Sequence, residues 1–109
     1  MKTISKDFSM DSLQGESLKI ANAILNILPV DASGGGCRAF YSPKEWKERK
    51  EDYGLNSVLI VVHDGGDLAK YCNPDYESYS DCENLNKALE KIGYYLEGCT
   101  CWYSAVYKV

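Results

Sequence analysis

The segment HDGGD at residues 63–67 holds the side chains best suited to catalysis in this sequence. His63 is the only histidine, and an imidazole beside carboxylates can act as a general base or as one ligand of a divalent cation. Asp64 and Asp67 could supply oxygen ligands, while the two glycines would let backbone amides approach a substrate closely. One hypothesis is therefore a small metal- or nucleotide-dependent hydrolase centred on His63, Asp64 and Asp67. The alternative is an ordinary glycine-rich turn, with His63 hydrogen-bonded in the core on the face of Val61.

The five cysteines are the second group of reactive side chains. Cys99 and Cys101 are separated by one residue, whereas Cys37, Cys72 and Cys82 are scattered. Structural zinc sites draw on paired ligands about two to four residues apart, and this sequence has one tight pair and no second. We therefore expect reduced thiols, no resident metal and no cofactor.

Aromatic rings and carboxylates are interspersed between residues 71 and 81. Tyrosine offers a large, rigid contact face together with a hydroxyl group, which is why it is enriched at interfaces. We expect this stretch to set carboxylates and rings against a basic groove of a protein partner. The residues predicted to do so are Asp75, Tyr76, Glu77, Tyr79 and Asp81. The alternative is an acidic loop that serves solubility alone.

The net charge of −4 is unevenly distributed along the 109 residues. Residues 1–50 carry a net +2 and residues 51–109 a net −6, and six acids stand against one lysine between positions 64 and 83. An acidic protein gains no affinity from releasing the counterions of nucleic acid, so a direct nucleic-acid partner is disfavoured, whereas a partner with a basic protein surface is not.

No apolar run approaches the roughly 18 residues of a membrane span, and the first ten residues lack the apolar stretch of a secretory signal. We expect a cytoplasmic protein with no membrane partner.

Hydrophobic periodicity and end signals predict three helices and four strands. The helices are expected at Asp11–Pro29, at Pro43–Asp52 after the capping residue Ser42, and from a capping box at Ser80 to Gly93. The strands are expected at residues 37–41, 58–62, 94–97 and 102–108, and an irregular stretch at 68–80. The length has room for one domain with one modest core. The expected fold is a single α+β domain over residues 1–109, in the order α-β-α-β-α-β-β, with a small mixed or antiparallel sheet and helices on one face.

Three phrases in the C-terminal half resemble a known group of proteins. They are Val62-His63-Asp64-Gly65-Gly66-Asp67-Leu68-Ala69, Asn73-Pro74-Asp75-Tyr76 and Gly98-Cys99-Thr100-Cys101-Trp102-Tyr103-Ser104-Ala105. The chain resembles small accessory proteins of phages and plasmids, which include anti-CRISPR and anti-restriction proteins, and its size and acidity are similar to those of a type II-A anti-CRISPR protein. The resemblance transfers no functional residue. It implies an inhibitor of a host defence nuclease, and the modest charge implies action through a local patch or allosterically rather than as a full mimic of duplex DNA.

The leading hypothesis is a non-enzymatic binding protein of mobile-element origin that inhibits a nucleic-acid-guided nuclease of the Cas9 type. The hydrolase centred on His63 is the first alternative, and it requires a cation or a turnover that depends on this imidazole. The second alternative is a self-associating structural domain, whose C-terminal hairpin continues the sheet across a homodimer.

Overall fold

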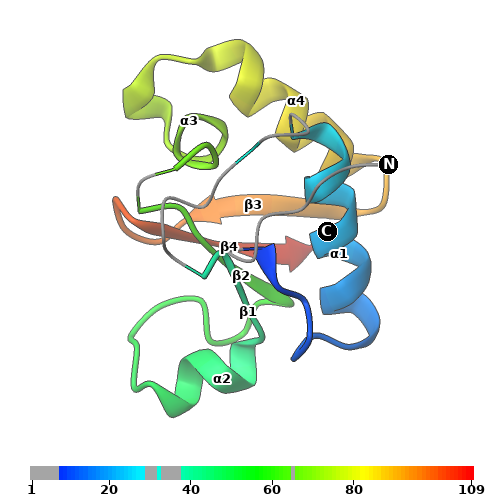
Figure 1. Cartoon of the computed structure of the whole chain (residues 1–109), viewed down its shortest axis with the longest axis vertical. Helices are drawn as coiled ribbons and strands as arrows, with labels where there is room; N and C mark the ends of the chain where they lie inside the picture. Colours follow the sequence, from blue (N-terminus) through cyan, green and yellow to red (C-terminus); the bar gives the residue numbers. More distant parts are fainter. Residues whose placement is uncertain (1–7, 29–31, 33–37, 65) are drawn as a thin grey trace.

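In the computed structural model, which describes residues 8–28, 32, 38–64 and 66–109, four strands form one antiparallel sheet in the order β1-β2-β4-β3 (Figure 1). The strands are β1 (Phe40–Tyr41), β2 (Leu59–Val62), β3 (Tyr94–Gly98) and β4 (Tyr103–Lys108). All four residues of β2 are buried, as expected for a β-branched apolar run in the middle of a sheet. β3 and β4 form the predicted antiparallel hairpin, with Leu96 opposite Val106.

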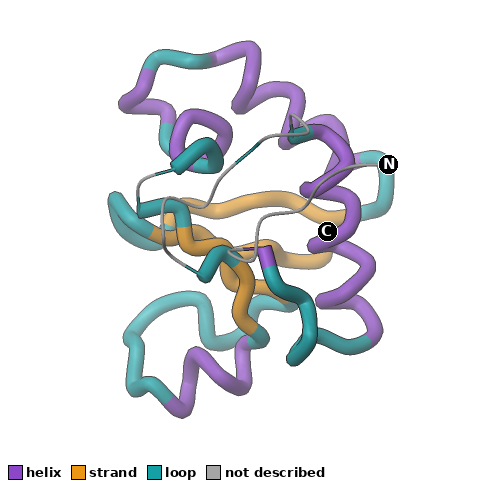
Figure 2. The backbone as a smooth tube through the Cα atoms, in the orientation of Figure 1, coloured by secondary structure: helices purple, strands orange, loops and turns teal. Residues whose placement is uncertain are grey.

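The described helices are α1 (Gly15–Ile27), α2 (Pro43–Glu48), α3 (Ala69–Cys72) and α4 (Tyr79–Glu90), and a 3₁₀ turn η2 covers Pro74–Tyr76. Together with the sheet they confirm the predicted α+β class. Figure 2 shows the helical segments surrounding the strands. Within the described residues, no helix is both long and apolar enough to cross a membrane.

The first face of the sheet packs against α1 and α4. Successive side chains of a strand point to opposite faces, and on this face Leu59, Val61 and Val106 contribute to one buried cluster. Ile20 and Ile24 of α1 and Leu85 and Leu89 of α4 complete that cluster, and all four are fully buried. The apolar stripes predicted for the first and third helices are therefore the surfaces that cover the sheet.

The second face of the sheet is covered by α2, which corrects the expectation that the helices lie on one face. Trp46 of α2 is fully buried against Ile60 and Tyr103, whose side chains alternate with those of the first face. Gly54 lies in the loop after this helix and has a φ of +81°. A Cβ at this position would lie 2.7 Å from Cδ1 of Ile60. Glycine is required here by both its backbone conformation and the close packing.

Two local expectations between residues 68 and 90 are wrong. The stretch predicted to be irregular contains α3 and η2. The capping box predicted at Ser80 does not form, because the amides of Asp81 and Cys82 donate to the Ser78 carbonyl and α4 already begins at Tyr79. Cys82 also donates its thiol proton to the Lys70 carbonyl at 3.2 Å, which links the first turn of α4 to α3.

Cys37, at the start of one predicted strand, lies outside the described residues.

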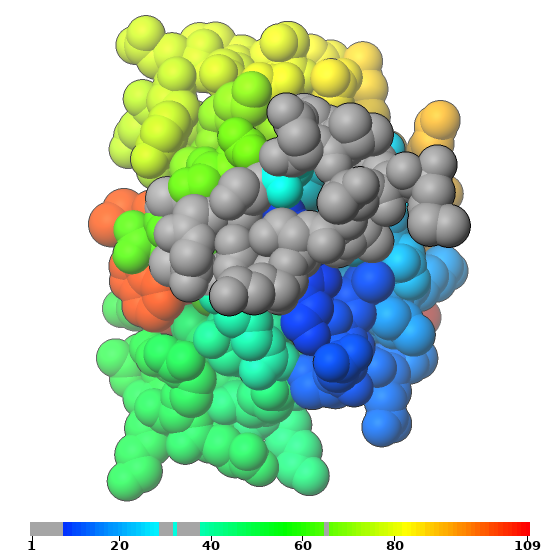
Figure 3. All heavy atoms as spheres, in the orientation of Figure 1, coloured from blue at the N-terminus to red at the C-terminus, as the bar shows by residue number. Residues whose placement is uncertain are grey.

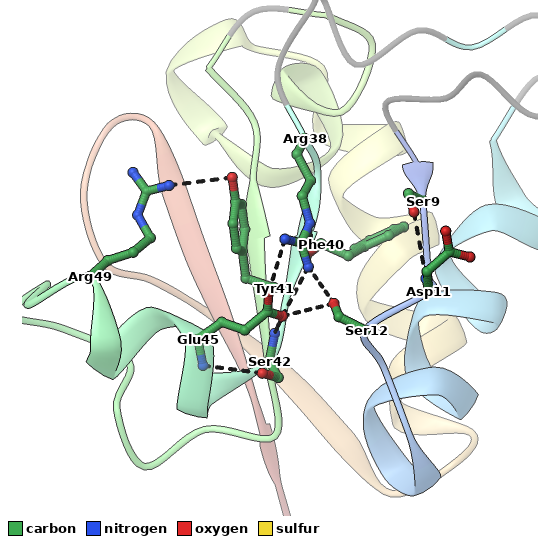
Figure 4. A network of polar contacts seen from close by, with 9 residues as sticks. All are labelled: Ser9, Asp11, Ser12, Arg38, Phe40, Tyr41, Ser42, Glu45 and Arg49. Atoms are coloured by element: carbon green, nitrogen blue, oxygen red, sulfur yellow. Dashed lines mark hydrogen bonds and ion pairs between the residues drawn. The ribbon is translucent and has the colours of Figure 1, made fainter.

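A polar network fastens β1 and α2 to the segment before α1 (Figure 4). Arg38 binds both carboxylate oxygens of Glu45 at 2.9 Å, and the Ser12 hydroxyl donates to the same carboxylate at 2.8 Å. Ser42 and Glu45 form the predicted capping box at the start of α2. Burial alone would raise the pKa of Glu45, but the hydrogen bonds from Arg38, the Ser42 amide and Ser12 outweigh it and lower the pKa to about 2.

This network predicts a pH-dependent loss of stability on replacing Glu45 with glutamine. A carboxyl whose pKa is lowered by folding stabilises the protein above its ordinary pKa of 4.5, and that contribution disappears as the pH falls towards about 2. Urea unfolding should show Glu45→Gln less stable by about 1–2 kcal/mol at pH 7, with the difference closing below pH 4.5. A difference that stays constant down to pH 2 would contradict the role of the ionised carboxylate.

Candidate functional site

The stretch of residues 73–81, which we call the acidic tyrosine segment, comprises η2 and the first residues of α4. The Asn73 side chain accepts a hydrogen bond from the Asp75 amide at 3.0 Å, and Pro74 occupies the first position of η2. Glu77 then adopts the left-handed conformation with φ 59°, and its amide donates to the Pro74 carbonyl at 2.9 Å. Non-glycine residues rarely take this conformation, which here ends η2.

The segment presents its rings and most of its carboxylates to solvent. Tyr76 is 56% exposed and Tyr79 65% exposed, and Asp75 and Glu77 are exposed beside them. Asp81 differs, because it is only partly exposed and lies 3.9 Å from the Lys70 ammonium. In Figure 3 this yellow-green part of the chain forms one end of the molecule, opposite the green atoms around α2. The five residues predicted to bind a partner therefore lie on one stretch of surface.

His63 lies immediately after β2 and is 2% exposed. Its amide donates to the Trp102 carbonyl at 2.9 Å, and its Nε2 is 2.9 Å from the Ser104 hydroxyl oxygen. Burial lowers the pKa of His63 below its ordinary value, against the opposing negative charge of Asp64. The structure therefore agrees with the alternative, in which His63 is a buried, hydrogen-bonded histidine.

Among the cavities formed by the described residues, His63 and Asp64 line different ones. His63 lines a cavity beside η2, whereas Asp64 lines a different pocket with Arg38 and Arg49 near α2. Asp64 is exposed, and Asp67 is partly buried. In the described part of the chain, no group of three or more His, Cys, Asp or Glu side chains is placed to hold a metal ion. The geometry therefore gives this arrangement little support as a catalytic centre.

The described cysteines are free thiols: Cys72, Cys82, Cys99 and Cys101. Burial raises the pKa of Cys72 well above its ordinary range, and it also raises the pKa of Cys82 and Cys99. The thiolate is the reactive form of cysteine, so these three side chains are poor nucleophiles at neutral pH.

Sequence reasoning missed Ser104, the buried partner of His63. Ser104 lies opposite Val61 in the β2–β4 pair and is 1% exposed. The sequence shows a serine among apolar strand residues, which indicates a buried polar group in need of a partner. Its contact with His63 depends on the register of two strands about 40 residues apart in the chain, which the sequence does not show.

Comparisons with known proteins place the chain in no family: no family model, no curated protein and no solved structure matches it.

The hydrogen bond between His63 and Ser104 predicts a stability effect with an internal control. Ser104→Ala leaves a buried ring nitrogen without its partner and should cost about 1–3 kcal/mol in urea unfolding. Ser57 is also buried, but its hydroxyl has no partner among the described residues, so Ser57→Ala should be neutral or stabilising. Equal losses in the two variants would show that the His63–Ser104 bond contributes nothing specific.

Proposed function

We propose that the protein is a non-enzymatic binding protein of mobile-element origin that inhibits a nucleic-acid-guided defence nuclease of the Cas9 type. The acidic tyrosine segment is the contact surface, and it occupies a basic groove that otherwise holds nucleic acid. The inhibited nuclease would be in the same compartment, the cytoplasm.

The observation that carries this proposal is the exposure of Tyr76 at the end of η2 and of Tyr79 at the start of α4. Buried aromatic anchors supply much of the binding energy of protein interfaces, and an exposed ring that is already ordered loses little entropy on binding. Asn73, Pro74 and the left-handed Glu77 provide this order within the segment. A surface kept only for solubility has no need of two large exposed rings.

The charge of the segment supports a basic partner. Asp75 and Glu77 are exposed beside Tyr76, and Lys70 is paired with Asp81 at the far end of the segment. Complementary charge steers association and is screened by salt, so the complex should weaken as ionic strength rises. Such an interface buries on the order of 800 Å² per partner and involves about 20–30 residues on each side, more than the segment contains. Neighbouring parts of the surface therefore contribute to the contact.

Charge reversal in the segment tests the proposal with a matched control. Asp75→Lys/Glu77→Lys should reduce affinity for a guide-RNA-loaded Cas9-type nuclease by about tenfold or more, measured by co-elution and by inhibition of DNA cleavage. Glu48→Lys/Asp52→Lys makes the same change of net charge on exposed residues near α2, and it should have a smaller effect. A wild-type chain that forms no complex with such nucleases overturns the proposal, as does an equal loss in both variants.

Removing one ring tests the aromatic contribution separately. Tyr76 and Tyr53 are both 56% exposed, but Tyr53 lies in the loop after α2. Tyr76→Ala should weaken the complex by about 2 kcal/mol, as is typical of an interface anchor, whereas Tyr53→Ala should leave it unchanged. Binding that is insensitive to Tyr76 but sensitive to Tyr53 would move the contact to the α2 end of the molecule.

A further inference from the structure

A cavity of about 290 Å³ opens between η2 and the turn that joins β3 to β4. Asn73 and Asp75 line it on the side of η2, and Gly98 and Thr100 line it on the side of the hairpin. His63 and Ser104 also line the cavity, and both are almost fully buried. Ligand pockets run from about 300 to 1,000 Å³, so this cavity suits a single side chain rather than a larger ligand.

Gly98 keeps this cavity open. It lies directly opposite Ser104 in the β3–β4 pair, and side chains of directly paired residues point to the same face of a sheet. A side chain at this position would therefore project beside Ser104. A Cβ built on Gly98 meets no atom within 4 Å, so nothing in the packing excludes a larger residue. Glycine inside a strand often marks a place where a ligand approaches closely.

His63 forms part of the cavity wall and is 2% exposed. Its Nε2 contacts Ser104, while its Nδ1 is enclosed by protein and has no hydrogen-bond partner among the described residues. The imidazole therefore contributes a planar ring, held by Ser104, to the cavity wall.

The charge of the cavity favours a cation. Among its described lining residues Asp75 is the only acid, and lysine and arginine are absent.

We propose that this cavity binds an arginine side chain of the partner, with the guanidinium against Asp75. This inference rests on the proposed function and names the group by which the basic partner is anchored. A guanidinium carries five N–H donors in a planar fork, so it can bind both oxygens of the Asp75 carboxylate at once. An ammonium group has three donors at one point and matches a carboxylate less well.

The test uses Nα-acetylarginine amide as the probe and Nα-acetylcitrulline amide as its uncharged analogue. Each is titrated into the full-length ¹⁵N-labelled chain, and the amide and histidine ring resonances are followed by NMR. We expect the arginine probe to shift Asn73, Asp75, Thr100 and the ring of His63, and to bind about tenfold more tightly than citrulline. Equal binding of the two probes, shifts located elsewhere or no shifts would overturn the inference.

Three variants sharpen this test. Asp75→Asn should abolish the preference for arginine over citrulline, whereas Asp52→Asn removes the same charge from an exposed residue after α2 and should preserve it. Gly98→Leu should fill the cavity and prevent binding of both probes, with folding checked by circular dichroism. If Gly98→Leu does not fold, Asp75→Asn against Asp52→Asn still decides the question, and a preference for arginine that survives Asp75→Asn overturns the inference.

Failure of this inference is distinguishable from failure of the proposed function, because the titration requires no nuclease. If the arginine probe binds no better than the citrulline probe, the inference about the cavity is wrong. The charge-reversal experiment with the nuclease still tests the proposed function independently. If Gly98→Leu folds and binds the nuclease as tightly as the wild type, the cavity is not the anchoring site, although the segment remains the contact surface.

Discussion

The burial of β2 on both faces is the constraint on which the rest of the structure depends. Leu59 and Val61 pack under α1 and α4, while Ile60 and Val62 pack against the layer around Trp46. A strand without an exposed face must end where the chain becomes polar, and it does so at His63. This position places the imidazole at the end of the sheet, where the neighbouring strand supplies Ser104 as its partner.

The acidic tyrosine segment and the cavity behind it form one region of the molecule. α3 and η2 pass over the end of the sheet, so Asn73 and Asp75 contribute both to the exposed turn and to the cavity wall. Tyr76 projects outward from the same turn, since it is more than half exposed. Because Asn73 and Asp75 belong to both, we propose the segment and the cavity as one binding region.

Much of the fold could be predicted from the sequence because its signals are local. The β-branched run at residues 58–62, the capping box at Ser42 and the turn at Gly93 each specify an element through the residues they contain. The start of α4 could not be predicted in this way: Ser80 carries a capping pattern, but the amides of Asp81 and Cys82 donate to the Ser78 carbonyl and the helix begins at Tyr79. The exposure of the predicted contact residues is likewise local, whereas the cavity arises from the register of β3 against β4 and from the packing of η2, which no short motif encodes.

Amide hydrogen exchange of the protein, free and bound to a guide-RNA-loaded Cas9-type nuclease, tests the central claim most directly. Exchange slows where an interface excludes solvent and restrains local opening. If the acidic tyrosine segment is the contact surface, exchange should slow at residues 73–81 and at the 98–101 turn, and it should be unchanged in α2. Slower exchange confined to α2 and its following loop, with residues 73–81 unaffected, would contradict the account.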